Sequence, residues 1–130
     1  MQTDPISDFI TCLRNAVRAH LVEVTVPHSR VKGQIARVLK EEGYLSDVEI
    51  IPNGKKPLLK VRLRVEGKRY ALTDIQRESK PGLRRYVSCK EIPRVLGGMG
   101  IAVLSTPKGI ITGHKAKKLG LGGELLLTVH

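Results

Sequence analysis

The pattern of hydrophobic residues changes near residue 72, and this change constrains the fold more than any other feature of the sequence. Before it, apolar residues recur at helical spacing in two segments and alternate with polar residues in three others. After it, the long helical patterns stop, and short apolar runs are broken by proline and glycine, as at Pro81-Gly82 and residues 120–123. We therefore predict an α+β protein with two small lobes, residues 1–72 and residues 73–130.

The first lobe is predicted to hold two helices on a three-stranded sheet. Asp4-Pro5 suits a helix start, because a carboxylate can cap free N–H groups and proline fits the first helical position. Ser29 can cap a second helix that ends at Gly43. The expected helices run from Pro5 to about Ala19 and from Ser29 to Gly43, and the expected strands cover residues 22–26, 45–51 and 58–65. In the second helix the predicted inward-facing residues are Val31, Ile35, Val38 and Leu39.

The last predicted strand of this lobe has one apolar and one basic side. Its apolar residues alternate with Lys60, Arg62 and Arg64, so one face packs on the helices and the other carries charge. The basic side has two readings, a solvated outer face of the sheet or part of a contact with a polyanion.

The second lobe is predicted to be mostly β, with one short helix. Residues 101–129 read as a strand, a polar loop, a short basic helix, a glycine turn and a final strand. This lobe carries 10 basic and 4 acidic residues in 58 positions, whereas the first carries 13 and 8 in 72. The whole chain has a formal net charge of +11, so a polyanionic partner is expected, with the second lobe as the main contact.

Several classes of protein do not fit the sequence. The longest apolar runs are far shorter than the roughly 20 residues that span a bilayer, and no secretory signal opens the chain, so we expect a cytoplasmic protein. Cys12 and Cys89 lack zinc-ligand spacing and are predicted to be buried free thiols. No phosphate-binding loop, nucleophile elbow or metalloprotease motif occurs, so we expect no catalysis, no metal, no cofactor and no small-molecule substrate.

The polar loop around residue 106 is the best candidate for recognition. Ser105 and Thr106 offer adjacent hydroxyls that can donate and accept, as recognition of a 2′-hydroxyl or a base edge requires. Lys108 would lie beside a phosphate, and Gly109 would let a nucleic-acid backbone approach closely. Glu124 could accept from an exocyclic amine or hold a nearby lysine.

Two segments resemble one family. The C-terminal segment Ser-Thr-x-Lys-Gly-Ile-Ile-Thr, followed by Ala116 and Leu119-Gly120-x-Gly122-Gly123-Glu124, is similar to the signature of ribosomal small-subunit protein eight. Asp4-Pro5-Ile6-Ser7-Asp8 with Arg14-Asn15-Ala16 resembles the opening of the same family. The resemblance covers essentially the whole chain. It implies a structural constituent of the small ribosomal subunit that binds the central domain of 16S rRNA and helps to assemble the platform. Proteins five and twelve of that subunit are the neighbours it implies.

The resemblance also implies site residues. In the second lobe these are Ser105, Thr106, Lys108, Gly109, Glu124 and Tyr86, although a tyrosine on a strand can equally be a half-buried core residue. In the first lobe they are Thr3, Asp4, Ser29, Lys32, Lys55 and Lys56, for which a helix cap or a solvated charge is an equal alternative.

The chain departs from the family pattern at Pro107, where a second serine is usual, and at Gly113-His114-Lys115, where an acidic-basic run is common. One hydroxyl contact is therefore missing, and proline stiffens the loop instead. Two other functions remain open: a translational repressor that binds its own operon messenger RNA through the same surface, and a DNA-binding architectural protein. The second fits the charge, but no helix-turn-helix or zinc finger supports it.

Overall fold

The computed structural model describes residues 4–130, and Thr3 lies outside the described residues. The chain forms two compact units. One is Pro5–Thr73, and the other consists of Asp74–His130 together with Asp4. Both combine helix and sheet, so the α+β class is confirmed. None of the helices in residues 4–130 is long and apolar enough to cross a bilayer.

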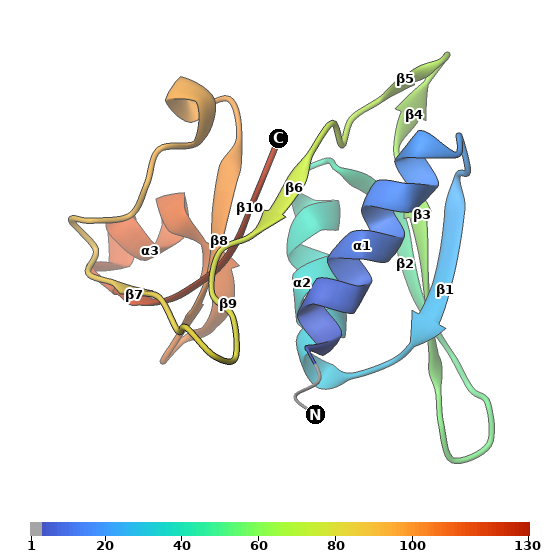
Figure 1. Ribbon diagram of the computed structural model, residues 1–130, viewed down its shortest axis with the longest axis horizontal. Helices are drawn as coiled ribbons and strands as arrows, with labels where there is room; N and C mark the ends of the chain where they lie inside the picture. The colour runs from blue at the N-terminus through green and yellow to red at the C-terminus, as the bar shows by residue number, and fades with distance from the viewer. Residues whose placement is uncertain (1–3) are drawn as a thin grey trace. The chain divides into compact units, whose positions relative to one another are not determined.

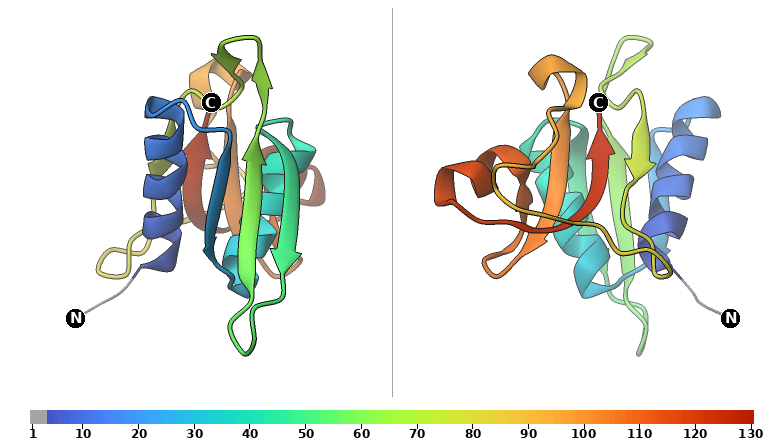
Figure 2. Two further views of the ribbon diagram at one scale, coloured as in Figure 1. Left: turned by 90° about the vertical axis from the view of Figure 1, so that its right-hand side faces the viewer. Right: turned by 60° about the vertical axis from the view of Figure 1, so that its left-hand side comes forward.

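The unit Pro5–Thr73 is a three-stranded antiparallel sheet with two helices on one face. Strand order is β1-β3-β2, and the left view of Figure 2 shows the opposite face of the sheet uncovered. β2 pairs with β3 as a hairpin from Leu45 to Ile51, around a turn in which Gly54 has a φ of +59°. A short β4–β5 hairpin was not predicted. The elements are α1 (Pro5–Arg18), β1 (Glu23–Pro27), α2 (Arg30–Glu41), β2 (Leu45–Ile51), β3 (Leu58–Leu63), β4 (Val65–Glu66) and β5 (Arg69–Tyr70) (Figure 1).

Helix α2 begins where the sequence predicts, because the Ser29 side chain accepts a hydrogen bond from the Lys32 N–H at 3.2 Å. Its buried stripe differs from the prediction at one position. Val31 is 40% exposed, whereas Lys32 is only 8% exposed and lies on the same stripe as Ile35 and Leu39. Ile35 and Leu39 follow Lys32 by three and seven positions, so the three residues lie on the same side of the helix. A lysine is tolerated there because its aliphatic stem can pack on apolar surface while its charged end stays in water.

The uncovered face of the sheet carries both signs of charge. Glu23 Oε1 lies 3.1 Å from Lys60 Nζ and 3.9 Å from Arg62 Nη1, and Asp47 and Glu49 line a shallow depression with the same residues. Cross-strand pairs of opposite charge are typical of a solvated sheet surface. The basic stripe of the sequence is therefore interleaved with acids.

The second unit is built around the last strand. β10 pairs with β6, β7 and β8, and β8 pairs in turn with β9. A β-bulge interrupts the β10–β8 ladder between Leu125 and Leu127. Helix α3 packs on this sheet over a core that includes Leu104, Ala116 and Leu125. The elements are β6 (Ile75–Arg77), β7 (Tyr86–Val87), the 3-10 turn η1 (Val95–Gly98), β8 (Ile101–Thr106), β9 (Gly109–Thr112), α3 (Gly113–Leu119) and β10 (Gly123–Val129) (Figure 1).

Two predictions are wrong in detail. The polar loop is a tight turn between β8 and β9, so Ser105 and Thr106 are paired strand residues rather than loop residues. Cys12 is exposed and Cys89 is only partly buried, although both thiols are free as predicted. Cys12 is exposed because the buried stripe of α1 runs through Phe9, Ile10, Leu13 and Ala16.

Candidate nucleic-acid interface

Three of the residues that the sequence singled out lie in one row across three neighbouring strands. Glu124 on β10 pairs with Tyr86 on β7 on one side and with Ser105 on β8 on the other. Directly paired residues of antiparallel strands place their side chains on the same face of the sheet, about 5 Å apart at Cβ. Tyr86 is 69% exposed, so the alternative of a half-buried core residue is wrong. We call this set the Tyr86–Glu124–Ser105 row.

Glycine lets the three strands approach closely at the row. A Cβ at Gly123 would collide with the backbone carbonyl oxygen of Ser105, and one at Gly122 would collide with the carbonyl oxygen of Val87. Backbone cannot move aside as a flexible side chain can, so larger residues here would force β10 away from its neighbours. Gly122-Gly123 therefore sets the spacing of the row.

The β8–β9 turn lies directly beyond the row. Thr106 Oγ1 donates to the carbonyl oxygen of Gly109 at 2.9 Å and accepts from the Lys108 N–H at 3.1 Å. Gly109 has a φ of +101°, which L-residues rarely adopt, and its outer side is open. The Thr106 hydroxyl thus closes the turn, leaving one acceptor lone pair, and Lys108 is exposed at the tip.

Ser105 differs from Thr106 in its hydrogen bonding. Within residues 4–130 its hydroxyl makes no hydrogen bond, and the residue is only partly buried. A hydroxyl carries one donor and two acceptor positions. Ser105 therefore presents a free donor and acceptor on the face that Tyr86 and Glu124 share.

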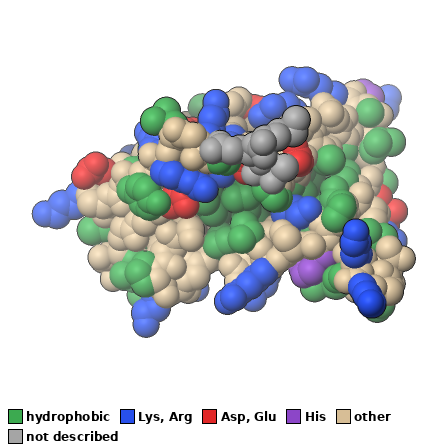
Figure 3. Space-filling view, turned by 60° about the horizontal axis from the view of Figure 1, so that its bottom comes forward, with side chains coloured by type: hydrophobic (Ala, Val, Ile, Leu, Met, Phe, Trp, Pro, Cys, Tyr) green, Lys and Arg blue, Asp and Glu red, His purple; other side chains and the backbone are tan. Residues whose placement is uncertain are grey.

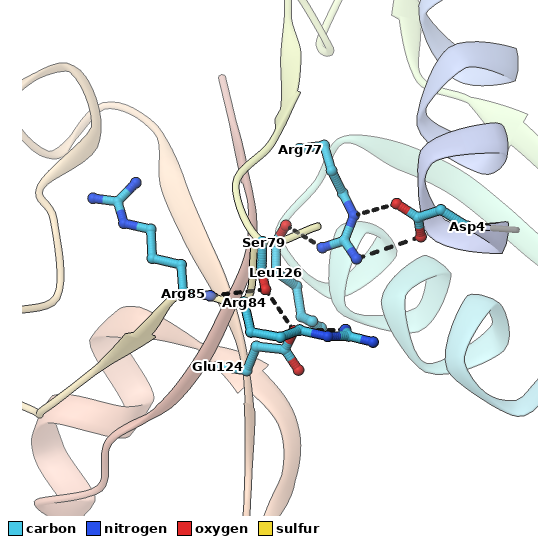
Figure 4. Close-up of polar contacts among 7 residues, drawn as sticks. All are labelled: Asp4, Arg77, Ser79, Arg84, Arg85, Glu124 and Leu126. Carbon is cyan, nitrogen blue, oxygen red and sulfur yellow. Dashed lines mark hydrogen bonds and ion pairs between the residues drawn. The ribbon is translucent and has the colours of Figure 1, made fainter. Parts of the chain in front are cut away.

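Glu124 is held by two partners that the sequence did not indicate. Its Oε2 accepts from Ser79 Oγ at 2.6 Å and from Arg84 Nη1 at 2.9 Å, as Figure 4 shows. Partial burial raises the pKa of Glu124, but the hydrogen bonds from Ser79 and Arg84 and the charges of Arg84 and Arg77 outweigh it and hold the pKa below its ordinary value. The carboxylate is therefore ionised at neutral pH and already paired.

Ser79 fixes this arrangement from inside the protein. It is fully buried, and its Oγ also accepts from the backbone N–H of Arg85 at 3.1 Å. Between Ser79 and Arg85 the chain turns at Pro81-Gly82, where Lys80 and Leu83 exchange two backbone hydrogen bonds. This short turn brings Arg84 back over Glu124.

Asp4 lies in a similar structural pair. Its Oδ2 is 3.1 Å from Arg77 Nε and its Oδ1 is 3.4 Å from Arg77 Nη2, while Arg77 Nη1 donates to the carbonyl oxygen of Leu126 (Figure 4). The two side chains are 17% and 7% exposed. Asp4 directly precedes α1, as the predicted cap requires, and its carboxylate is the counterion of Arg77.

The other predicted contacts of the first lobe are not gathered into one cluster. Ser29 is the cap of α2, Lys32 is buried beside it, and Lys55 and Lys56 are exposed in the β2–β3 turn. On the face that Figure 3 draws, Lys and Arg side chains alternate with hydrophobic side chains. Charge alone therefore does not locate a site, whereas the row and its turn do.

Sequence reasoning missed Ser79, Arg84 and Arg77. The only local signal was the turn Lys80-Pro81-Gly82-Leu83, which returns Arg84 toward residue 79. The partners Glu124 and Asp4 lie 40 and 73 positions away from Arg84 and Arg77. Among residues 4–130 no three His, Cys, Asp or Glu side chains gather closely enough to hold a metal ion.

Comparison with known proteins gives one consistent result. The family model described as Ribosomal protein S8 matches residues 4–130. Proteins named small ribosomal subunit protein uS8 from Nitrosococcus oceani and Koribacter versatilis are 49% identical over 127 residues and 44% identical over 131 residues. These alignments cover 98% and 100% of this chain and 97% and 98% of the relatives. The protein of the same name from Caldicellulosiruptor bescii is 49% identical over 127 residues, with 97% of this chain and 96% of the relative covered.

Proposed function

Because this chain belongs to the ribosomal protein S8 family, we propose that it binds the central domain of 16S rRNA and helps to assemble the platform of the small subunit. It is a structural constituent of the small ribosomal subunit and not an enzyme. Its partners are ribosomal RNA and ribosomal proteins, and as finer assignments we propose proteins five and twelve as neighbours and the cytoplasmic ribosome as its location.

One observation supports the proposed RNA contact above the others. On one face, the Tyr86–Glu124–Ser105 row combines an exposed aromatic ring with a hydroxyl that has no hydrogen-bond partner within residues 4–130, next to a turn that offers Lys108. Unstacked RNA bases stack on aromatic rings, and hydroxyls bond to base edges and to the 2′-hydroxyl. An irregular RNA helix, in which bases are displaced from regular stacking, supplies such groups.

The other site residues enter the proposal with smaller roles. Lys55 and Lys56 are exposed and can neutralise a phosphate, which positions the protein without reading sequence. Ser29 and Asp4 already serve a helix cap and an ion pair, and little of Lys32 reaches the surface. We therefore place the main contact on the second unit.

The test is binding of the purified full chain to a central-domain RNA fragment and to a scrambled RNA of equal length. We expect Tyr86→Ala and Ser105→Ala each to weaken cognate binding by about fivefold or more, and scrambled RNA much less. The double charge reversal Lys55→Glu/Lys56→Glu should weaken both RNAs mildly. Loss of binding only in the lysine double variant, with the row variants unchanged, would place the contact elsewhere.

A further inference from the structure

We infer that Glu124 is a positioning residue that holds the Arg84 guanidinium beside the Tyr86–Glu124–Ser105 row, and that Arg84 binds an RNA phosphate there. The inference rests on the proposed RNA-binding function of the row. It differs from the sequence-based reading of Glu124, in which the carboxylate itself accepts from a base or holds a lysine. It also adds a contact residue, Arg84, that neither the charge pattern nor the motif indicated.

The hydrogen bonds of Glu124 support this role. One oxygen, Oε2, accepts from both Ser79 and Arg84, and the Glu124 side chain is 16% exposed. The Arg84 side chain is 48% exposed. A guanidinium has five N–H donors, and among the contacts of residues 4–130 the Arg84 guanidinium donates through Nη1 alone, to Glu124. The remaining donors can therefore meet a ligand at the surface.

The charge balance gives the second argument. A carboxylate in a surface that binds a polyanion repels the polyanion. Glu124 is therefore expected to have a function that outweighs this repulsion. Paired with Arg84, the carboxylate is neutralised, and it orders a side chain that otherwise has many rotamers. A planar fork held in place matches two phosphate oxygens at a smaller entropic cost than a free arginine.

Arg85, the next residue along the chain, provides an internal comparison. Its Nη1 lies 2.7 Å from Glu78 Oε2, and its side chain is 51% exposed, close to the value for Arg84. Figure 4 shows Arg85 pointing away from Glu124 and Arg84. The two arginines thus have the same charge, similar exposure and a carboxylate partner each, but only Arg84 lies at the row. Arg85 and Glu78 are matched controls.

The experiment measures binding of the full chain to the central-domain RNA fragment and to scrambled RNA across a salt series. We expect Arg84→Ala to weaken binding about tenfold and to lower the log–log salt slope by about 0.7–0.9, the value for one phosphate contact. Glu124→Gln should weaken binding about threefold in the wild-type background and have no further effect in the Arg84→Ala background. Arg85→Ala and Glu78→Gln should change binding less than twofold.

The opposite results are equally clear. Simple electrostatics predicts tighter binding for Glu124→Gln, because a negative charge is removed, so unchanged or tighter binding overturns the positioning role. An equal loss with and without Arg84 would assign Glu124 a direct contact instead. An Arg84→Ala variant with an unchanged salt slope would show that Arg84 meets no phosphate.

Two further measurements keep the outcomes distinct. Arg84→Ala alters a side chain that is 48% exposed and should leave the protein folded, so its salt slope is decisive even if Glu124→Gln fails to fold. If Tyr86→Ala and Ser105→Ala also leave binding unchanged, the proposed function of the row fails as a whole. If they weaken binding while the Arg84 and Glu124 variants do not, only the positioning inference fails.

Discussion

Ser105 and Thr106 are adjacent hydroxyl residues that the structure separates into different roles, so their alanine variants should behave differently. The Thr106 hydroxyl makes two hydrogen bonds in the β8–β9 turn, at 2.9 Å and 3.1 Å. Each such bond contributes about 0.5–1.5 kcal/mol, and exposure of both puts them at the low end, so Thr106→Ala should destabilise the fold by about 1 kcal/mol. Ser105→Ala removes no hydrogen bond within residues 4–130 and should change stability by less than about 0.5 kcal/mol.

In RNA binding the two variants should change places: Ser105→Ala should reduce the preference for cognate over scrambled RNA more than Thr106→Ala does. Ser105→Ala should delete the proposed hydrogen bond to RNA, and the loss of one neutral hydrogen bond is about 1 kcal/mol, or a fivefold change in cognate affinity. Scrambled RNA should lose much less, and the salt slope should stay the same because no charge is removed. Thr106→Ala should weaken cognate and scrambled RNA to a similar extent, because it loosens the turn that presents Lys108. Thr106→Ser keeps the hydroxyl and serves as the control.

Urea unfolding of each variant and titration with both RNAs measure the two effects separately. Wild-type stability for Thr106→Ala would refute the assignment of its hydroxyl to the turn. Equal losses on cognate and scrambled RNA for Ser105→Ala would refute its reading role. Failure of Thr106→Ser to restore stability would show that the methyl group, not the hydroxyl, carries the effect.

Four other outcomes follow from contacts described above. Lys108→Ala should weaken every RNA alike and reduce the salt slope by about one unit or less in a salt titration, because it removes one exposed cation. Asp4→Ala should destabilise the protein by about 3 kcal/mol in urea unfolding, since Arg77, which is 7% exposed, loses its carboxylate counterion while staying buried. Because the pKa of Glu124 is lower in the folded protein than its ordinary value of 4.5, the carboxylate stabilises the fold fully above pH 4.5, and this stability is lost as the pH falls through the pKa of the folded state. Glu124→Gln should therefore make the free energy of unfolding depend less on pH in that acidic range. Cys12 should react with a thiol reagent in the native protein, and Cys12→Ser should cost less than about 0.5 kcal/mol.

Local signals in the sequence predict local structure well. The cap at Ser29 and the limits of β2 depend on neighbours within a few positions, and both are confirmed, whereas the strand predicted over residues 58–65 ends at Leu63. The burial of Lys32 in place of Val31 could not be predicted, because both positions lie near the edge of the apolar stripe and only packing decides between them.

The candidate site was predictable as a set of residues but not as an arrangement. Ser105 and Glu124 were indicated by their motif, yet their position opposite each other depends on the register of strands that are distant in sequence. The same holds for the link between Arg84 and Glu124, for which neither residue carries a local sign. Periodicity reports which face a side chain occupies, whereas register decides which neighbour it meets.

The position of β10 in the second unit has a consequence for how the protein is made. A chain emerges from its N-terminus, so residues 5–73 can complete all their strand pairings before the second unit has been synthesised. The second unit cannot do so, because β6, β7 and β8 share β10 as their common neighbour and β10 is translated after all of them. Before β10 is synthesised, β7 and β8 have no strand that joins them, so Tyr86 and Ser105 are not held side by side. The Tyr86–Glu124–Ser105 row therefore does not exist in a nascent chain that lacks β10. If the row binds RNA as proposed, recognition would thus arise only once β10 has been synthesised, and nascent chains that lack β10 would not compete for the same RNA.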